Sequence, residues 1–141
     1  MTLALKDKNC VELILSIILQ RSIRIDNVYT QDVMKNLIGR SGILDIVAID
    51  TLGVLYNLDV QNNNEGAHPK RLRYHGSLMD IHFTDVNISW KDIPRRYVIF
   101  ITQKDVMKKG LPIYHIRQRI DEDGQEFNDE EMMIYVNGEN E

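Results

Sequence analysis

The stretch that decides the fold is LDIVAIDTLGVLYNLDVQ, residues 44–61, in which two apolar segments flank a short TLG turn ending at Gly53. Both segments are rich in β-branched and aromatic side chains, and glycine suits the left-handed position of a common three-residue hairpin turn. We therefore predict a β-hairpin. Each of its strands carries a carboxylate, Asp45 in the first and Asp59 in the second, although the surrounding sequence is typical of buried strands.

The turn fixes the pairing register, and the register decides where the two acids point. With a three-residue turn, Val47 pairs with Asn57. Asp45 then lies directly opposite Asp59, and because side chains alternate along a strand, Gln61 shares the face of Asp59. A two-residue turn would instead send the two acids to opposite faces, as unrelated surface residues. The spacing alone leaves both registers open.

In the first register, two like charges lie opposite each other, which destabilises a sheet. A divalent cation between the carboxylates offsets this repulsion. Mg²⁺ is typically held by one or two carboxylates, with water and phosphate oxygens completing its octahedron. The three-residue turn thus predicts a metal site at Asp45 and Asp59.

Length and composition indicate a single domain. The chain has 141 residues, of which 43% are hydrophobic, and this fits one domain over residues 1–141 with a sizeable core. Its single cysteine, Cys10, excludes an internal disulfide framework and fits a reduced, cytoplasmic setting. No apolar run approaches the roughly 20 residues of a membrane span, so we expect no membrane partner.

The net charge of −4 is unevenly distributed along the chain. Residues 121–141 hold nine acids and no Lys or Arg, so residues 1–120 carry all 17 basic residues against 12 acidic ones. A local basic surface can bind a polyanion such as DNA whatever the total charge. The alternative is an ordinary mixed surface. We interpret the acidic segment Asp121 to Glu131 as a solvated hairpin tip rather than as a DNA mimic that shields the basic surface.

The remaining patterns predict a mixed β-sheet flanked by helices, an α/β (α+β) fold. Asn9 and Glu12 resemble a capping box at the start of a mostly buried helix. Periodicity and turn residues predict a further helix over residues 67–83 and strands over residues 23–31, 96–102, 112–119 and 132–136.

The sequence GRSGILDIVAIDTLGVLYNLDVQ, residues 39–61, followed by the basic helix PKRLRYHGSLMD, resembles the PD-(D/E)XK nuclease family transposases, also called recombination-promoting nucleases. The signature is an acid in one strand, a turn, and then acid-x-Lys or acid-x-Gln in the next strand. The likeness extends from about Val28 to the strand near Val136. It implies a restriction-endonuclease-like PD-(D/E)XK core and metal-dependent cleavage of DNA phosphodiesters.

By this resemblance, Asp45, Asp59 and Gln61 are the catalytic residues. Asp45, Asp59 and the backbone carbonyl of Val60 would hold Mg²⁺ or Mn²⁺. Gln61 occupies the position of the motif lysine, where it can orient water but supplies no positive charge. Arg40, just before the first strand, is a candidate source of that charge.

The chain departs from the family pattern at two positions. Ile43 stands where relatives often carry a basic residue, and Asp59 stands where they more often have Glu. The shorter Asp59 side chain retracts its carboxylate by about one methylene group, and either change would weaken metal binding.

The helix that begins near Pro69 carries the predicted DNA contacts Lys70, Arg71, Arg73 and Tyr74. Arg and Lys neutralise phosphates, and Tyr can hydrogen-bond or stack. Helical spacing places Arg71, Tyr74 and His75 on one face. The alternative is a solvated basic face with Tyr74 packed on the sheet.

Other polar residues carry weaker hypotheses. His68, His75 and His82 recur every seven residues, about 10 Å apart along a helix, which is too far to share one zinc, so we expect surface or packing roles. Glu12 is a candidate to approach the nuclease site from the first helix, with capping as its simpler role. The pairs Arg95-Arg96 and Lys108-Lys109 are interpreted as plain surface rather than as an extension of a DNA track.

The sequence thus predicts a metal-dependent DNA endonuclease, and double-strand cutting by a fold with a single site would suggest a homodimer. One alternative is a catalytically decayed nuclease fold that serves as a DNA-binding or protein-interaction module. Another is a subunit of a structural assembly.

Overall fold

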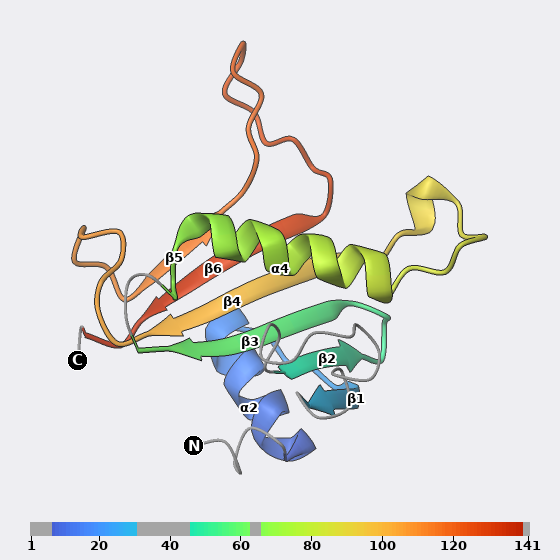
Figure 1. Cartoon of the computed structure of the whole chain (residues 1–141), viewed down its shortest axis with the longest axis horizontal. Helices are drawn as coiled ribbons and strands as arrows, with labels where there is room; N and C mark the ends of the chain where they lie inside the picture. The colour runs from blue at the N-terminus through green and yellow to red at the C-terminus, as the bar shows by residue number, and fades with distance from the viewer. Residues whose placement is uncertain (1–6, 31–45, 63–65, 140–141) are drawn as a thin grey trace.

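A computed structural model describes residues 7–30, 46–62 and 66–139 of the chain. Its six strands form one sheet in the order β1-β2-β3-β4-β6-β5, with α2 on one face and α4 on the other (Figure 1). The described elements are α2 (Lys8–Leu19), β1 (Ile25–Thr30), β2 (Ile46–Asp50), β3 (Leu55–Gln61), α4 (Pro69–His82), the 3-10 turn η1 (Trp90–Asp92), β4 (Arg96–Thr102), β5 (Ile113–Ile116) and β6 (Glu131–Asn137).

The sheet is mixed. β2 pairs antiparallel with both β1 and β3, whereas β3, β4 and β6 are parallel to one another, and β5 closes one edge antiparallel to β6. Helix α4 makes the connection between the parallel strands β3 and β4, as such a crossover requires. The predicted α+β class, a mixed sheet flanked by helices, is confirmed.

Apolar side chains pack on both faces of the sheet. Val11 and Leu15 of α2 pack on one face, and Leu72 and Met79 of α4 pack on the other. This is why β4, with the sequence RYVIFIT, is nearly continuous in apolar residues: a strand covered on both sides needs no polar alternation. None of the helices within the described ranges is long and apolar enough to cross a membrane.

The hairpin has the predicted three-residue turn. Gly53 adopts a left-handed conformation with φ +87°, and its N–H donates to the carbonyl of Asp50 at 3.1 Å. The Asp50 N–H donates to the carbonyl of Val54, and Val47 pairs with Asn57 as the register prediction required. Asp45 lies outside the described residues.

A third acid of the hairpin, Asp50, closes the turn. Its carboxylate accepts from the backbone N–H groups of Leu52 and Val54, each at 2.9 Å, and from the Tyr56 hydroxyl at 2.7 Å. Burial and the Asp50 carboxylate together raise the pKa of Tyr56, so its hydroxyl keeps its proton. Asp50 is therefore a structural acid of the turn.

Helix α2 differs from the prediction in two ways. Its N-cap is Asp7, whose side chain accepts from the Asn9 N–H, so the predicted capping box at Asn9 and Glu12 is wrong. The Glu12 carboxylate instead accepts from the Ile25 N–H at 2.7 Å and fixes the entry into β1. The helix is also not mostly buried, because Leu13 and Ile17 lie exposed on its outer face.

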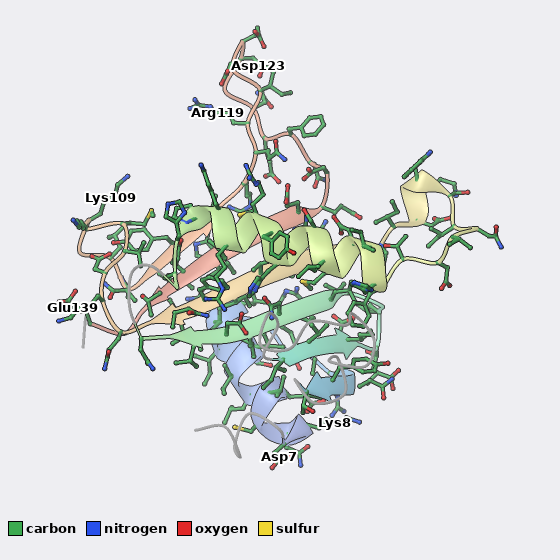
Figure 2. All side chains as sticks on the ribbon, in the orientation of Figure 1. Asp7, Lys8, Lys109, Arg119, Asp123 and Glu139 are labelled. Carbon is green, nitrogen blue, oxygen red and sulfur yellow. The ribbon has the colours of Figure 1, made fainter. Side chains whose placement is uncertain are left out.

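The acidic segment projects from the body on an extended arm, residues 117–130, on which Figure 2 labels Arg119 and Asp123. The arm is a narrow hairpin joined by a bridge between Arg119 and Glu126, and its residues are all exposed. The prediction of a solvated hairpin tip is confirmed, and strand β5 ends earlier than expected because the chain enters this arm.

Candidate active site

The polar residues Asn57, Asp59 and Gln61 alternate along β3 and face α4. Asn57 and Asp59 are buried, with Asp59 only 2% exposed, and Gln61 is half-buried toward the carboxyl end of the strand. Val60, between them, packs in the apolar cluster on the α2 face. The predicted gathering of polar side chains on one face of the second hairpin strand is confirmed.

Helix α4 is held over this face at its N-terminal end. Pro69 occupies the first turn, and the Nδ1 atom of the N-cap His68 accepts from the Lys70 N–H at 3.0 Å. The Tyr135 hydroxyl of β6 donates to the Ala67 carbonyl, and burial raises the pKa of Tyr135 to about 12. The position of the helix relative to the sheet is therefore fixed just before its first turn.

His75 of α4 is fully buried against the β3 acids, which the sequence did not reveal. Its Nδ1 atom lies 2.9 Å from Asn57 Oδ1 and 2.9 Å from Asp59 Oδ2. Only the Asn57 contact has hydrogen-bond geometry, so the carboxylate lies beside the N–H rather than on its axis. The ring packs edge-on against Phe100, with centroids 5.2 Å apart.

The hydrogen bonds around His75 indicate which ring nitrogen donates and which accepts. The Nδ2 group of Asn57 donates to the Ile46 carbonyl at 3.0 Å, which turns Oδ1 toward the ring. On the other side, the Arg71 Nε–H donates to His75 Nε2 at 3.3 Å. Because Nε2 accepts, the ring carries its proton on Nδ1, the atom that lies beside Asn57 Oδ1 and Asp59 Oδ2.

Arg71 also connects the helix to Gln61. Its Nη1 atom lies 3.5 Å from Gln61 Oε1, at the long limit of a hydrogen bond. The Arg71 guanidinium therefore lies between His75 and Gln61, in a row of side chains that begins at the buried Asp59 and ends at the half-buried Gln61. A fixed positive charge beside a partly open carboxamide is suited to bind a phosphate oxygen.

The predicted DNA contacts on α4 differ in exposure and in the direction they face. Lys70 and Arg73 are exposed on α4, and Tyr74 is also exposed, while Arg71 and His75 face β3. Of the three residues predicted to share a face, Tyr74 is the exposed one. Arg40, like Asp45, lies outside the described residues.

Two hypotheses about other polar residues are corrected. Glu12 contacts the start of β1 from α2, on the opposite face of the sheet from α4, so it does not approach Asp59. Arg96 is not a surface residue: its buried guanidinium bonds Asp80 at 2.8 Å and Glu131 at 2.7 Å.

The described donors alone do not complete a metal site. Among residues 7–30, 46–62 and 66–139, no group of three or more His, Cys, Asp and Glu side chains is placed to hold a metal ion. Asp59 offers one carboxylate and Gln61 one amide oxygen, so the predicted site depends on Asp45 for its second carboxylate. Hard oxygen donors of this kind are those that Mg²⁺ and Mn²⁺ take.

Comparisons with protein-family models, with curated proteins and with solved structures found no match to this chain. The family resemblance rests on the hairpin and helix motifs quoted above.

The sequence missed Asn57 and His75 as site residues. Asn57 had a signal, because it precedes Asp59 and Gln61 at the same two-residue spacing and must share their face. His75 lies one helical turn beyond Arg71, but no sequence pattern showed that this side of the helix would pack on the polar face of β3.

Proposed function

We propose that the chain is a metal-dependent DNA endonuclease of the PD-(D/E)XK type, acting with Mg²⁺ or Mn²⁺. One observation carries the proposal: Asp59 and Gln61 lie on the same face of β3, where Asp59 lies beside His75 and Gln61 beside Arg71 of the basic helix α4. In the resembled family, acid-x-Lys or acid-x-Gln occupies these positions.

Each residue has a role in this proposal. Asp59 would hold the metal with Asp45 and the Val60 carbonyl. A bound Mg²⁺ would polarise a phosphoryl oxygen and lower the pKa of a water molecule. Gln61 orients the attacking water. Arg71 supplies the positive charge that the motif lysine would give, since its guanidinium already contacts Gln61.

Asn57 and His75 act as positioning residues for the acid. With the Asn57 amide fixed by the Ile46 carbonyl and the ring fixed between Asn57 and Arg71, His75 presents its Nδ1 side to the Asp59 carboxylate, 2.9 Å away. Lys70 and Arg73, exposed on the same helix, extend the positive surface for the DNA backbone.

One observation favours the second candidate, a decayed nuclease fold that binds DNA without cutting it. Asp59 is nearly inaccessible and already contacts His75, and its side chain is one methylene shorter than the usual Glu. A chain that had lost its metal could keep this polar contact as part of its core.

Cleavage and DNA binding measured together separate the two candidates. Nicking of supercoiled plasmid with Mn²⁺ is expected for the wild type and is lost in Asp59→Asn and Asp45→Ala. The matched control Asp26→Asn removes an equal charge from the exposed surface of β1 and keeps activity. A wild-type protein that shifts DNA in a gel but does not nick it, and that binds no Mn²⁺ by calorimetry, would support the decayed fold and contradict the nuclease proposal.

A further inference from the structure

The segment between α4 and β4 carries exposed apolar side chains. It extends beyond one end of the sheet, in yellow in Figure 1. Trp90 is 90% exposed, Val86 98% and Ile81 of the adjoining helix end 69%. Trp90 stands on the 3-10 turn η1, where the Asp92 N–H donates to the Ser89 carbonyl at 2.9 Å. Large apolar side chains held exposed on ordered backbone are typical of binding surfaces.

Two clefts flank Trp90. The first has a volume of about 480 Å³ and the second about 380 Å³, and both include Asp80, Trp90 and Ile93 in their walls. The second cleft is otherwise mainly aliphatic, with Ile81 and Val86 among its residues. Their volumes lie in the range of natural ligand sites.

The first cleft is acidic. Its charged lining consists of Asp80, Lys91, Arg96, Asp129, Glu130 and Glu131, which is four carboxylates against two cations. The buried Arg96 guanidinium forms ion pairs with Asp80 and Glu131 and so balances two of the four carboxylates.

The other two carboxylates lack a strong cationic partner in the described chain. Asp129 accepts from the Gln118 amide at 3.2 Å and from the Glu131 N–H at 3.0 Å, both neutral donors. Glu130 has only a long, half-exposed contact of 3.5 Å with Arg95. Exposed pairs of this length contribute little, so the cleft keeps a negative field around the Trp90 indole.

We propose that Trp90 and its two clefts bind a protein segment in which a Lys or Arg side chain is next to a large aliphatic one. The cation lies against the indole face and is attracted by Asp129 and Glu130, while the aliphatic side chain enters the cleft of Ile81 and Val86. The acidic lining favours such a cation over the DNA backbone.

This surface lies apart from the proposed nuclease site. Arg96 and Glu131 are the first residues of β4 and β6, whereas Gln61 ends the parallel strand β3. The clefts, which include Asp80 and Ile81 at the C-terminal end of α4, therefore lie at the opposite end of the sheet from Gln61. A partner bound at Trp90 leaves the N-terminal part of α4 free for DNA.

Trp90 is the single tryptophan of the chain and reports directly on binding. The probe is a short acetylated and amidated peptide with a central Arg-Leu pair in a Gly-Ser background, titrated into the full chain. We expect a saturable blue shift of the Trp90 emission. Comparison peptides with Glu-Leu or Arg-Ser in place of the pair are expected to bind much more weakly.

Variants test each half of the surface. The double variant Asp129→Asn, Glu130→Gln is expected to weaken Arg-Leu binding about fivefold, since each exposed ion pair contributes little. Its matched control, Glu122→Gln with Asp123→Asn at the arm tip, changes the net charge equally and keeps full affinity. Val86→Ser tests the aliphatic cleft and is also expected to weaken binding.

Several outcomes would overturn the proposal. They are the absence of a saturable shift with the Arg-Leu peptide, an equal response to the Glu-Leu peptide, and equal weakening by the control double variant. A blue shift that grows with protein concentration alone, with a dimer mass by light scattering, would assign the surface to a second copy of the chain instead.

Discussion

Asp59 is an acid in a strand that is covered on both faces, and at the scale of single residues its neighbours explain how the fold tolerates it. An ionised carboxylate is costly to bury unless donors surround it. The His75 Nδ1 atom lies 2.9 Å from Asp59 Oδ2, and the Arg71 guanidinium contacts the far side of the same ring. The imidazole of His75 therefore lies between the guanidinium and the carboxylate.

Removing the His75 side chain is expected to destabilise the fold. His75→Ala leaves the buried Asp59 carboxylate without its His75 contact and should lower the free energy of unfolding by about 3 kcal/mol, measured by urea denaturation. In an Asp59→Asn background the same change should cost at least about 1 kcal/mol less, because no charge is left behind. Strictly additive losses would show that the two side chains are not coupled.

At the scale of elements, the contact between α4 and β4 depends on a residue without a side chain. The Arg96 guanidinium packs against Gly76 of α4, and a Cβ atom placed there would lie 2.4 Å from Arg96 Nη1. This nitrogen is buried and has no hydrogen-bond partner among the described residues. The helix can approach the strand closely only because Gly76 leaves room for the guanidinium.

Gly76→Ala should therefore destabilise the protein, although alanine normally favours a helix by about 1 kcal/mol. The new methyl group must displace Arg96 from Asp80 and Glu131, and we expect a net loss of about 2 kcal/mol in the free energy of unfolding. Ser77→Ala, one residue further on the exposed side, is the control and should change stability by less than about 0.5 kcal/mol. Equal effects of the two substitutions would contradict the close packing.

Among the elements, the hairpin follows from the local sequence, whereas the position of α4 on the sheet does not. The turn at Gly53 requires a left-handed residue, so the hairpin register and the polar face of β3 were predictable from local chemistry. The position of His75 was not, since it depends on how α4 lies across the sheet. The burial of Arg96 was not predictable either, because nothing local indicates that Asp80 and Glu131, distant in sequence, would enclose it.

At the scale of the whole molecule, the response to acid follows from carboxylates that are bonded in the folded state. Burial alone would raise the pKa of Glu131, but hydrogen bonds from Gln118 and Arg96 outweigh it and hold the pKa below its usual value. A carboxylate with a lowered pKa stabilises the fold at pH values above its unfolded-state pKa, about 4.3 for Glu. That stabilisation is lost as the pH falls through the lower folded-state pKa.

Glu131→Gln should thus be less stable than the wild type at pH 7, and the difference should narrow below about pH 3, where the wild-type carboxylate also becomes neutral. Urea unfolding of both proteins at pH 7 and pH 3 measures this. Glu122→Gln on the exposed arm is the control and should show no such change with pH. A difference between Glu131→Gln and wild type that stays constant with pH would exclude the ionised Glu131 as its source.

The proposal that Asp59 is a metal ligand is tested most directly by anomalous X-ray scattering from crystals grown with Mn²⁺. A nuclease site predicts an anomalous peak within about 2.2 Å of an Asp59 carboxylate oxygen, with Asp45 as a second ligand. The peak should be absent from crystals of Asp59→Asn grown under the same conditions. A map without a peak at Asp59, with its carboxylate still against His75, would contradict the account.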